Sequence, residues 1–311
     1  MLECEGLKIA IQKSGRLTEP TIDLLKGCDL KFTITDRVDI AHVRNPDIYM
    51  DILLMRSRDI PDTLINDDVD LGIVGYDIFR ESQAPLVLLM PLGYGACRIS
   101  LGVKKEVPYA IPADLTQAVV ATSYPNIAQK FFDSQGVRVQ LRPLGGSVEL
   151  AARVGKANAV VDAVDSGESM RTNGLEEKEV IMESEAWLVA SPRLKQQKNK
   201  REIVENFLIR SLSYLRPKLN RWISMNVPSE LKEDILNTLL PYSQSPTVSL
   251  CELDMLDIAS IIPTNRFWDI IAELKAKGAR DIAELAMKRL IPDPDDSELM
   301  RIMYSIFEET E

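Results

Sequence analysis

Short apolar runs alternate with amphipathic segments through the first two-thirds of the chain. A polar turn around Gly15 follows the first run, and Thr18 and Pro20 then mark the start of a helix, since both residue types are favoured at helix N-termini. Asp59 and Pro61 mark the start of another helix in the same way. The strand-like runs are residues 7–11, 52–55, 71–74, 86–90 and 99–103. This alternation predicts an α/β protein with a largely parallel sheet.

A second set of alternating elements begins after a proline-containing linker at residues 104–112. Its expected strands and helices are residues 118–121, 125–134, 137–141, 147–154 and 159–164. A long helix is expected at residues 201–219. This order, in which the chain leaves one lobe, forms a second and returns, predicts a two-lobed, periplasmic-binding-protein-like region with a cleft between the lobes. Such clefts are preferred ligand sites. We expect lobe I to contain residues 1–104 and 184–221 and lobe II to contain residues 105–183.

The C-terminal residues follow a different order of elements. The expected strands and helices are residues 222–227, 229–240, 247–253, 256–262 and 265–277, with a weaker segment after Gly278. This β-α-β-β-α-β order predicts a ferredoxin-like domain over residues 222–311. Residues 281–288 favour helix by propensity, so a helix-favouring run is expected in place of the final strand. The tail at residues 292–311 has apolar residues at helical spacing and predicts an acidic amphipathic helix.

Composition excludes several classes of function. The chain has 37 Lys and Arg against 47 Asp and Glu, a formal net charge of -10, and this balance disfavours binding to nucleic acid or to anionic membranes. The only histidine is His42 and the four cysteines include no C-x-x-C pair, which disfavours a zinc site and the common histidine-dependent hydrolases. The N-terminus lacks signal-peptide features, and no apolar stretch approaches the roughly 18 residues of a membrane span. We therefore expect a soluble cytoplasmic protein with reduced thiols.

The most informative segment follows the apolar run at residues 159–164. It is the turn Asp165-Ser166-Gly167-Glu168-Ser169. Successive backbone N–H groups in such a turn form a concave anion site, the glycine allows close approach, and the hydroxyls add donors. Asp162, just upstream, suits ribose hydroxyls, so the segment predicts a site for a phosphorylated sugar. Similar short patterns occur in Asx turns and helix caps, and the turn taken alone favours that structural interpretation.

A second candidate lies at the carboxyl end of the first strand, where open α/β sheets bind ligands. Lys13 and Arg16 flank Gly15 there. Two cations around a glycine suit a phosphate or nucleotide contact, although a solvated turn explains one of them equally well.

Three further positions carry weaker signals. Asp70 and Leu71 begin a glycine-containing strand whose glycines indicate either close packing or a ligand floor. Arg98 precedes a strand and is either a surface cation or a cleft-facing one. Glu149 stands at a helix start, where a carboxylate is stabilised by the helix dipole in any case.

Six motifs taken together resemble the ATP phosphoribosyltransferase family. They are Gln12-Lys13-Ser14-Gly15-Arg16-Leu17, Asp59-Ile60-Pro61, Val69-Asp70-Leu71-Gly72-Ile73, Ala121-Thr122-Ser123-Tyr124-Pro125, Gly146-Ser147-Val148-Glu149 and the segment from Asp162 through Asn173-Gly174-Leu175. The motifs occur in order and span almost the whole chain. The ferredoxin-like C-terminal domain is similar to the regulatory domain in the long form of this family.

The resemblance implies an enzyme that joins adenine N1 of ATP to the ribose C1 of phosphoribosyl pyrophosphate (PRPP) and releases pyrophosphate, opening histidine biosynthesis. It also implies Mg²⁺, which we expect to be held by the substrate phosphates, so no protein metal ligand is assigned. Adenine N1 is itself the nucleophile, and no Ser, Cys or His nucleophile is needed. The residues expected to bind PRPP are Glu149, Asp162, Asp165, Ser166, Gly167, Glu168 and Ser169. The residues expected to bind ATP or pyrophosphate are Lys13, Gly15, Arg16, Asp70, Leu71 and Arg98.

The resemblance further implies inhibition by histidine and assembly of dimers into hexamers. The residues expected to bind histidine are Asn226, Ser245, Thr247 and Ile261. The chain departs from the family at Asp281, where many members have a small residue, and at Asp165, where many have Ser or Thr. Asp165 adds negative charge beside a phosphate, which requires compensation by backbone donors or by a cation.

Two other functions remain open. One is a two-lobed sensor or carrier of a small molecule, although two anion sites in one cleft exceed what a simple amino-acid binder needs. The other is a nucleobase-salvage phosphoribosyltransferase, which would share the PRPP chemistry. Such enzymes are usually shorter, have two adjacent acids before the turn and lack a split-βαβ tail.

Overall fold

The computed structural model describes residues 6–34, 39–45, 47–243, 245–252 and 254–307. The chain forms two compact units. The first comprises Met1–Asp23, Leu30–Val204 and Met300–Glu311, and the second comprises Leu24–Asp29 and Glu205–Leu299. Over the described residues, the first unit contains two sheets and the second contains one.

The first sheet has six strands in the order β2-β3-β1-β4-β11-β5. They are β1 (Leu7–Gln12), β2 (Ile40–Arg44), β3 (Tyr49–Met55), β4 (Leu71–Gly75), β5 (Val87–Pro91) and β11 (Ala186–Ala190). β1 runs parallel to β3 and β4, whereas β2 and β11 are antiparallel to their neighbours. The expectation of a largely parallel sheet is wrong here, because β2 pairs back on β3 and β11 enters the sheet in the opposite direction. β2 itself was not expected.

Helices follow three of these strands. They are α1 (Thr18–Gly27), α2 (Ile60–Ile65) and α3 (Tyr76–Ser82). Ile60 and Leu64 of α2 join Ala10 of β1 in one buried cluster. A β-carbon built on Gly72 of β4 would lie 2.9 Å from the side chains of both Ile60 and Leu64. The glycine therefore serves close helix packing on the sheet rather than a ligand floor.

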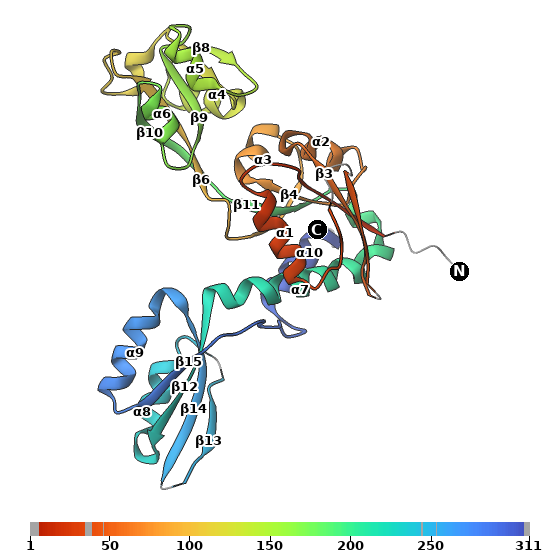
Figure 1. The fold of residues 1–311 in the computed structure, drawn as a ribbon, viewed down its shortest axis with the longest axis vertical. Helices are drawn as coiled ribbons and strands as arrows, with labels where there is room; N and C mark the ends of the chain where they lie inside the picture. The colour runs from red at the N-terminus through yellow and green to blue at the C-terminus, as the bar shows by residue number, and fades with distance from the viewer. Residues whose placement is uncertain (1–5, 35–38, 46, 244, 253, 308–311) are drawn as a thin grey trace. The chain divides into compact units, whose positions relative to one another are not determined.

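The second sheet has five strands in the order β10-β6-β9-β7-β8. They are β6 (Cys97–Lys104), β7 (Val119–Thr122), β8 (Gln140–Pro143), β9 (Ala159–Val164) and β10 (Leu175–Ser184), with helices α4 (Pro125–Ser134), α5 (Val148–Arg153) and α6 (Glu168–Thr172). The chain enters through β6 and leaves through β10, which pair antiparallel (Figure 1). β6 pairs with β9 and β10 and therefore belongs to the second sheet, although residues up to 104 were expected in lobe I. The predicted two-lobed arrangement is confirmed.

The second unit is built on a four-stranded antiparallel sheet in the order β13-β14-β12-β15. Its elements are β12 (Asn220–Pro228), α8 (Lys232–Leu239), β13 (Thr247–Leu250), β14 (Met255–Pro263), α9 (Phe267–Ala276) and β15 (Arg280–Leu285). This order and topology confirm the ferredoxin-like prediction. The expected loss of the final strand is wrong, because pairing with β12 overrides the helix propensity of β15. Residue 253, where a strand was expected to end, lies outside the described residues.

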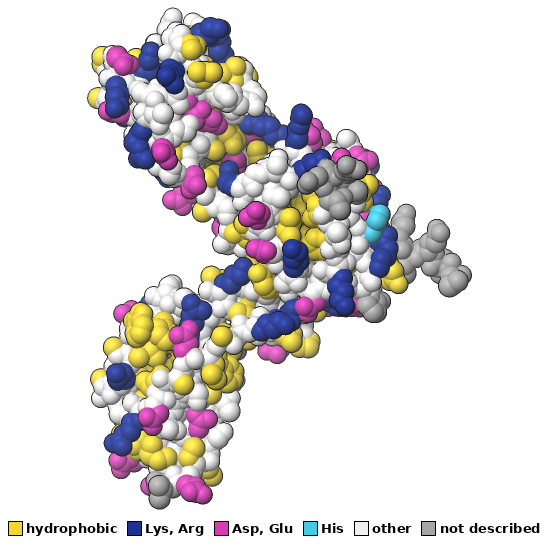
Figure 2. Space-filling view, in the orientation of Figure 1, with side chains coloured by type: hydrophobic (Ala, Val, Ile, Leu, Met, Phe, Trp, Pro, Cys, Tyr) yellow, Lys and Arg dark blue, Asp and Glu magenta, His cyan; other side chains and the backbone are white. Residues whose placement is uncertain are grey.

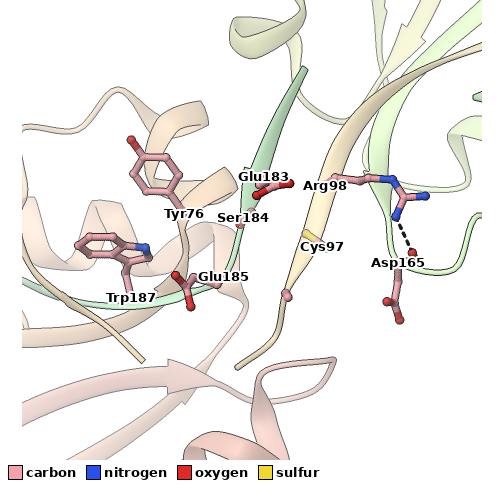
Figure 3. A pocket seen from close by; sticks show the side chains of 9 residues that line it. Tyr76, Cys97, Arg98, Asp165, Glu183, Ser184, Glu185 and Trp187 are labelled. Atoms are coloured by element: carbon pink, nitrogen blue, oxygen red, sulfur yellow. Dashed lines mark hydrogen bonds between the residues drawn. The ribbon is translucent and has the colours of Figure 1, made fainter. Parts of the chain in front are cut away.

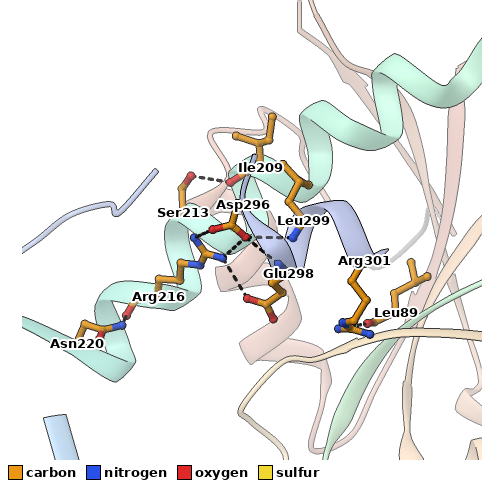
Figure 4. Close-up of polar contacts among 9 residues, drawn as sticks. All are labelled: Leu89, Ile209, Ser213, Arg216, Asn220, Asp296, Glu298, Leu299 and Arg301. Carbon is orange, nitrogen blue, oxygen red and sulfur yellow. Dashed lines mark hydrogen bonds and ion pairs between the residues drawn. The ribbon is translucent and has the colours of Figure 1, made fainter. Parts of the chain in front are cut away.

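The chain passes from one unit to the other within three helices, α1, α7 (Arg201–Leu219) and α10 (Ser297–Phe307). The tail helix was predicted, and its apolar residues Ile302, Met303 and Ile306 are buried. Asp296 precedes α10, and one of its oxygens accepts hydrogen bonds from the backbone N–H groups of Glu298 and Leu299, both at 3.1 Å (Figure 4). That carboxylate therefore caps the helix.

On the face drawn in Figure 2, basic and acidic side chains are interspersed rather than gathered into a patch of one sign. Of the helices within the described residues, none is both long enough and apolar enough to span a membrane.

Candidate active site

Three of the residues predicted to bind PRPP converge in the second lobe. The Ser169 hydroxyl at the start of α6 donates a 2.7 Å hydrogen bond to Glu149 Oε1 at the start of α5. Burial raises the pKa of Asp162, on β9, to about 6, and the charge of Glu149 adds to the rise while the Ala163 N–H opposes it. Two carboxylates thus lie near the carboxyl end of β9, where they can accept hydrogen bonds from hydroxyl groups.

The turn that follows β9 is open to solvent. Gly167 adopts a positive φ of 76°, a conformation in which a side chain would be strained. The Ser166 hydroxyl accepts a 3.3 Å hydrogen bond from the Glu168 N–H, which shapes the turn. Arg98 donates from Nη1 to the carbonyl oxygen of Asp165 at 2.9 Å (Figure 3). Arg98 therefore contacts the predicted phosphate turn rather than the residues predicted to bind ATP, with which it was grouped.

A cavity of about 520 Å³ lies at the carboxyl ends of β1, β3 and β4. Arg16, Arg56 and Arg58 line it from the loops after these strands, and the aromatic ring of Tyr124 lines it from the second lobe. The Arg58 guanidinium lies 5.2 Å from the centre of the Tyr124 ring. Three guanidinium groups and one aromatic ring suit a ligand with both phosphates and a flat base.

Asp77 connects residues around this cavity through hydrogen bonds. It was not among the site residues predicted from the sequence. Its side chain is 1% exposed. Oδ1 accepts hydrogen bonds from Arg16 Nη2 at 2.9 Å and from the Ser184 hydroxyl at 2.6 Å. Oδ2 accepts one from the Tyr124 hydroxyl at 2.7 Å. The buried carboxylate is thus compensated by donors from both lobes.

Two more contacts join the lobes beside Tyr124. Each carboxylate oxygen of Glu81, on α3, accepts a 3.0 Å hydrogen bond from a backbone N–H at the start of α4, those of Asn126 and Ile127. Arg58 donates from Nη2 to the Ser123 carbonyl at 2.6 Å. A first-lobe carboxylate therefore caps a second-lobe helix.

The structure separates other predicted residues from this cavity. Asp70 is 3% exposed and both of its oxygens accept hydrogen bonds from the buried Lys200 ammonium, at 2.7 and 2.9 Å. Asp70 directly precedes β4, and the fully buried Leu71 is its first residue. Both lie at the amino end of the strand, whereas the cavity lies at its carboxyl end. The structure therefore does not bring them together with Arg16, with which they were grouped. Lys13 forms an exposed ion pair with Asp39 at 2.6 Å.

A second cavity, of about 650 Å³, lies beside the strands that connect the lobes (Figure 3). Tyr76 and Trp187 line one side, with ring centres 5.8 Å apart, and Arg98 lines the other. Glu183 and Glu185 add negative charge. This lining suits an anionic phosphate less well than the cavity around Arg16 does.

Three residues predicted to bind histidine share one face of the sheet in the second unit. Ile223, Met225 and Val227 of β12 pack against the helices, so the alternating Asn226 lies on the opposite face. Pairing places Ile261 and Thr247 on that same face. The Asn226 amide donates to Asp281 Oδ2 at 3.1 Å, and Ser245 is exposed.

Comparison with known proteins identifies the family. The family model described as ATP phosphoribosyltransferase matches residues 56–212, and the model of the HisG C-terminal domain matches residues 218–289. A protein of Bacteroides fragilis named ATP phosphoribosyltransferase is 36% identical over 92% of this chain and 99% of its own length. One of the same name from Phocaeicola vulgatus is 34% identical over the same shares.

A solved structure agrees. It is the ATP phosphoribosyl transferase (HisG:HisZ) complex from Thermotoga maritima, 28% identical with a TM-score of 0.57, covering 66% of this chain and 95% of that chain. The similarity to the Bacteroides fragilis and Phocaeicola vulgatus proteins extends over 99% of the length of each. The chain therefore belongs to the ATP phosphoribosyltransferase family, the pentosyltransferases that catalyse the first step of histidine biosynthesis.

Proposed function

We propose that this protein transfers the phosphoribosyl group of PRPP to N1 of ATP, giving N1-(5-phosphoribosyl)-ATP and pyrophosphate. The observation that carries the proposal is the convergence of Glu149, Asp162 and Ser169 beside the turn after β9. Residues from three separate elements, α5, β9 and α6, thereby form one site with acceptors for ribose hydroxyls beside a turn with donors for a phosphate. The names of the relatives supply the choice of ATP as the acceptor.

The ATP would occupy the cavity lined by Arg16, Arg56 and Arg58, with its base against Tyr124. This assignment replaces Asp70 and Leu71 with residues at the carboxyl ends of the strands, where open α/β sheets bind ligands. In the reaction, adenine N1 forms a bond to ribose C1 while the bond from C1 to pyrophosphate breaks and pyrophosphate takes the electron pair. Ribose C1 gains oxocarbenium character, which Asp162 and Glu149 would stabilise by their negative charge.

The arrangement would accelerate the reaction chiefly by alignment. PRPP bound by the second lobe and ATP bound between the lobes would be held with the nucleophile facing C1. The contacts of Arg58, Asp77 and Glu81 with residues 123–127 fix the distance between the lobes. No side-chain nucleophile is needed, which agrees with a chain that has a single histidine.

Magnesium is proposed as the cofactor, bound with the substrate. Among the described residues, no three His, Cys, Asp or Glu side chains gather into a metal site. Mg²⁺ keeps several waters and is commonly bound through substrate phosphates, so we propose that the ion binds together with PRPP. The ion would neutralise the charge of the leaving pyrophosphate.

Histidine is proposed as a feedback inhibitor that binds the face carrying Asn226, Thr247 and Ile261 in the second unit. Amide, hydroxyl and carboxylate groups on this face suit an amino acid with an ammonium and a carboxylate. We also propose a homo-oligomer, a dimer or hexamer, in the cytoplasm. These proposals rest on the family resemblance.

The test is to mix the purified protein with ATP, PRPP and Mg²⁺, add pyrophosphatase to draw the reaction forward, and separate the nucleotides by chromatography. We expect N1-(5-phosphoribosyl)-ATP in amounts that require all three components, and less of it when histidine is added. Adenine in place of ATP is the matched control for a salvage enzyme. Product from adenine alone, or binding of ATP without product, would overturn the proposal.

A further inference from the structure

A side-chain cluster outside the Arg16 cavity surrounds the predicted phosphate turn. It consists of Arg98 and Ser100 on β6, Glu177 on β10 and Arg171 on α6. β6 lies between β9 and β10, and Arg98 is paired with Val164, the last residue of β9. The strand register therefore brings Arg98 to the point where the turn begins.

Arg98 is held in one orientation by three hydrogen bonds. Its Nε and Nη2 donate to the two carboxylate oxygens of Glu177 at 2.5 and 2.7 Å, and Nη1 donates to the Asp165 carbonyl at 2.9 Å. Glu177 is fixed in turn by the fully buried Ser100, whose hydroxyl donates to Oε1 at 2.7 Å. A bidentate guanidinium–carboxylate pair is a rigid arrangement.

Part of the guanidinium remains available. Arginine has five N–H donors, and over the described residues three of those of Arg98 form hydrogen bonds within the protein. The Arg98 side chain is 32% exposed, so a ligand can reach it. A β-carbon built on Gly167 would lie 3.9 Å from Arg98 Nη2 and 3.8 Å from Arg171 Nη1. Both guanidinium groups are thus beside the backbone of the turn.

Charge explains why a cation is needed at this place. The turn itself carries two carboxylates, Asp165 and Glu168, both exposed. A phosphate monoester brings close to two further negative charges, and like charges at short range repel. Arg98 and Arg171 are the cations beside the turn, and because Arg98 also pairs with Glu177, two guanidinium groups meet three carboxylates before a ligand binds. A phosphate would therefore be bound by the directed N–H donors of these groups and of the turn backbone rather than by an excess of positive charge.

We propose that Arg98 is a phosphate-binding residue, which Glu177 clamps beside the turn at residues 165–169 so that its free N–H groups bind the 5′-phosphate of PRPP. This inference rests on the proposed function for its ligand. It assigns Arg98 to the PRPP site, and it assigns Glu177 as the residue that positions it. The glycine at position 167 leaves the space in which phosphate and guanidinium meet.

The experiment compares Arg98→Gln and Arg98→Lys with Arg142→Gln. Arg142 is the matched control because its Nη1 also donates to a backbone carbonyl of the same lobe, that of Lys156 at 3.1 Å. We expect Arg98→Gln to raise KM for PRPP by about tenfold to a hundredfold, since a charge-assisted hydrogen bond is lost, and to leave KM for ATP within about twofold. Arg98→Lys keeps the charge and should give a smaller rise. Arg142→Gln should change neither constant.

Titration with ribose 5-phosphate tests the same site without turnover. We expect wild-type protein and Arg142→Gln to bind it alike, and Arg98→Gln to bind it more weakly. An unchanged KM for PRPP in Arg98→Gln, or an equal rise in KM for both substrates, would overturn the inference while leaving the proposed function intact.

If wild-type protein shows no turnover, the proposed function fails, and the ribose 5-phosphate titration still decides whether Arg98 binds phosphate. If Arg98→Gln does not fold, Arg98→Lys supplies the comparison, and wild-type constants in it would overturn the inference.

Discussion

The hydroxyl of Tyr124 donates a 2.7 Å hydrogen bond to Oδ2 of Asp77, a carboxylate that is 1% exposed. The two residues come from different lobes, Asp77 from α3 and Tyr124 from the residue before α4. Arg16 and Ser184 bind the other oxygen of the same carboxylate. One buried charge therefore connects the proposed ATP site to the contact between the lobes.

Replacing Tyr124 by Phe removes this hydrogen bond and keeps the ring under Arg58. One oxygen of Asp77 then loses its donor inside the protein, which costs about 1–3 kcal/mol. We expect a lower unfolding temperature and faster amide hydrogen exchange at the start of α4. Tyr109→Phe is the control, because Tyr109 donates to Glu179 at 3.0 Å within the second lobe. Equal acceleration of exchange at α4 in both variants would contradict the role of Tyr124.

Glu81→Gln tests the cap that the first lobe places on α4. Glutamine has one acceptor oxygen, so one of the two N–H groups of Asn126 and Ile127 would face an amide NH₂. We expect a loss of about 1–2 kcal/mol in stability and a rise in KM for both substrates, because the cleft is less well fixed. Asp114→Asn is the matched control. Asp114 accepts hydrogen bonds from two backbone N–H groups, but within its own lobe, so KM should not change.

The structure brings the residues predicted to bind PRPP closer together than those predicted to bind ATP, for a physical reason. Asp162 lies near the carboxyl end of β9, and Glu149 and Ser169 lie in the first turns of α5 and α6, so their chemistry is visible in short segments. The donors around Asp77 are far apart in the sequence, at Arg16, Tyr124 and Ser184, and only the fold brings them together. Asp77 could have been found from its position after a strand.

Asp70 lies apart from Arg16, with which it was grouped, because of its place in the strand. It precedes β4, whereas ligands bind at the carboxyl ends of strands in open α/β sheets. In the fold, hydrophobic periodicity located the buried strands but not β2, whose alternate residues, such as Ile40 and His42, are exposed. It also failed for β15, an edge strand with mostly exposed residues, because strand pairing is a tertiary interaction that local propensity does not report.

Asp162→Asn should stabilise the folded protein while it abolishes tight PRPP binding. Burial raises the pKa of Asp162 from the reference value of 3.8 to about 6, so the folded state binds its proton more tightly than the unfolded state does. Stability contributed by this group is therefore lost as pH rises from about 4 to 6, by about 3 kcal/mol in all. We expect the variant to unfold at a higher temperature than wild type at pH 8 and at the same temperature near pH 4. A lower unfolding temperature at pH 8 would show that the carboxylate is compensated in the fold.

Lys200→Met should destabilise the first unit by about 3–5 kcal/mol, because it leaves Asp70 charged and buried without its partner. Asp70→Asn combined with Lys200→Met should recover most of this loss, since neither residue is then charged. Denaturant unfolding of the single and double variants measures the coupling. The folded double variant should keep the wild-type KM for ATP. A raised KM in that variant would return Asp70 to the ATP site.

Arg216→Gln should weaken the cap of α10 in the second unit. Arg216 binds both oxygens of Asp296 at 2.7 Å and Glu298 at 3.1 Å (Figure 4). Its hydrogen bonds to Asp296 lower the pKa of that carboxyl, with burial opposing. Because the folded pKa is lowered, the stabilisation is present above about pH 4 and is lost as pH falls through the folded value.

At pH 7 we expect Arg216→Gln to cost about 1–2 kcal/mol, since both groups are largely buried and the contact is bidentate. The difference from wild type should shrink in acid, as Asp296 becomes protonated in both proteins. Arg266→Gln removes an exposed pair with Asp269 in the same unit, at 3.1 Å, and should change stability little at any pH. Thermal unfolding of wild type, Arg216→Gln and Arg266→Gln should be measured between about pH 3 and 7, a range that spans the titration of a carboxylate. A difference that stays constant with pH would mean that Arg216 stabilises the protein by packing rather than through the charge of Asp296.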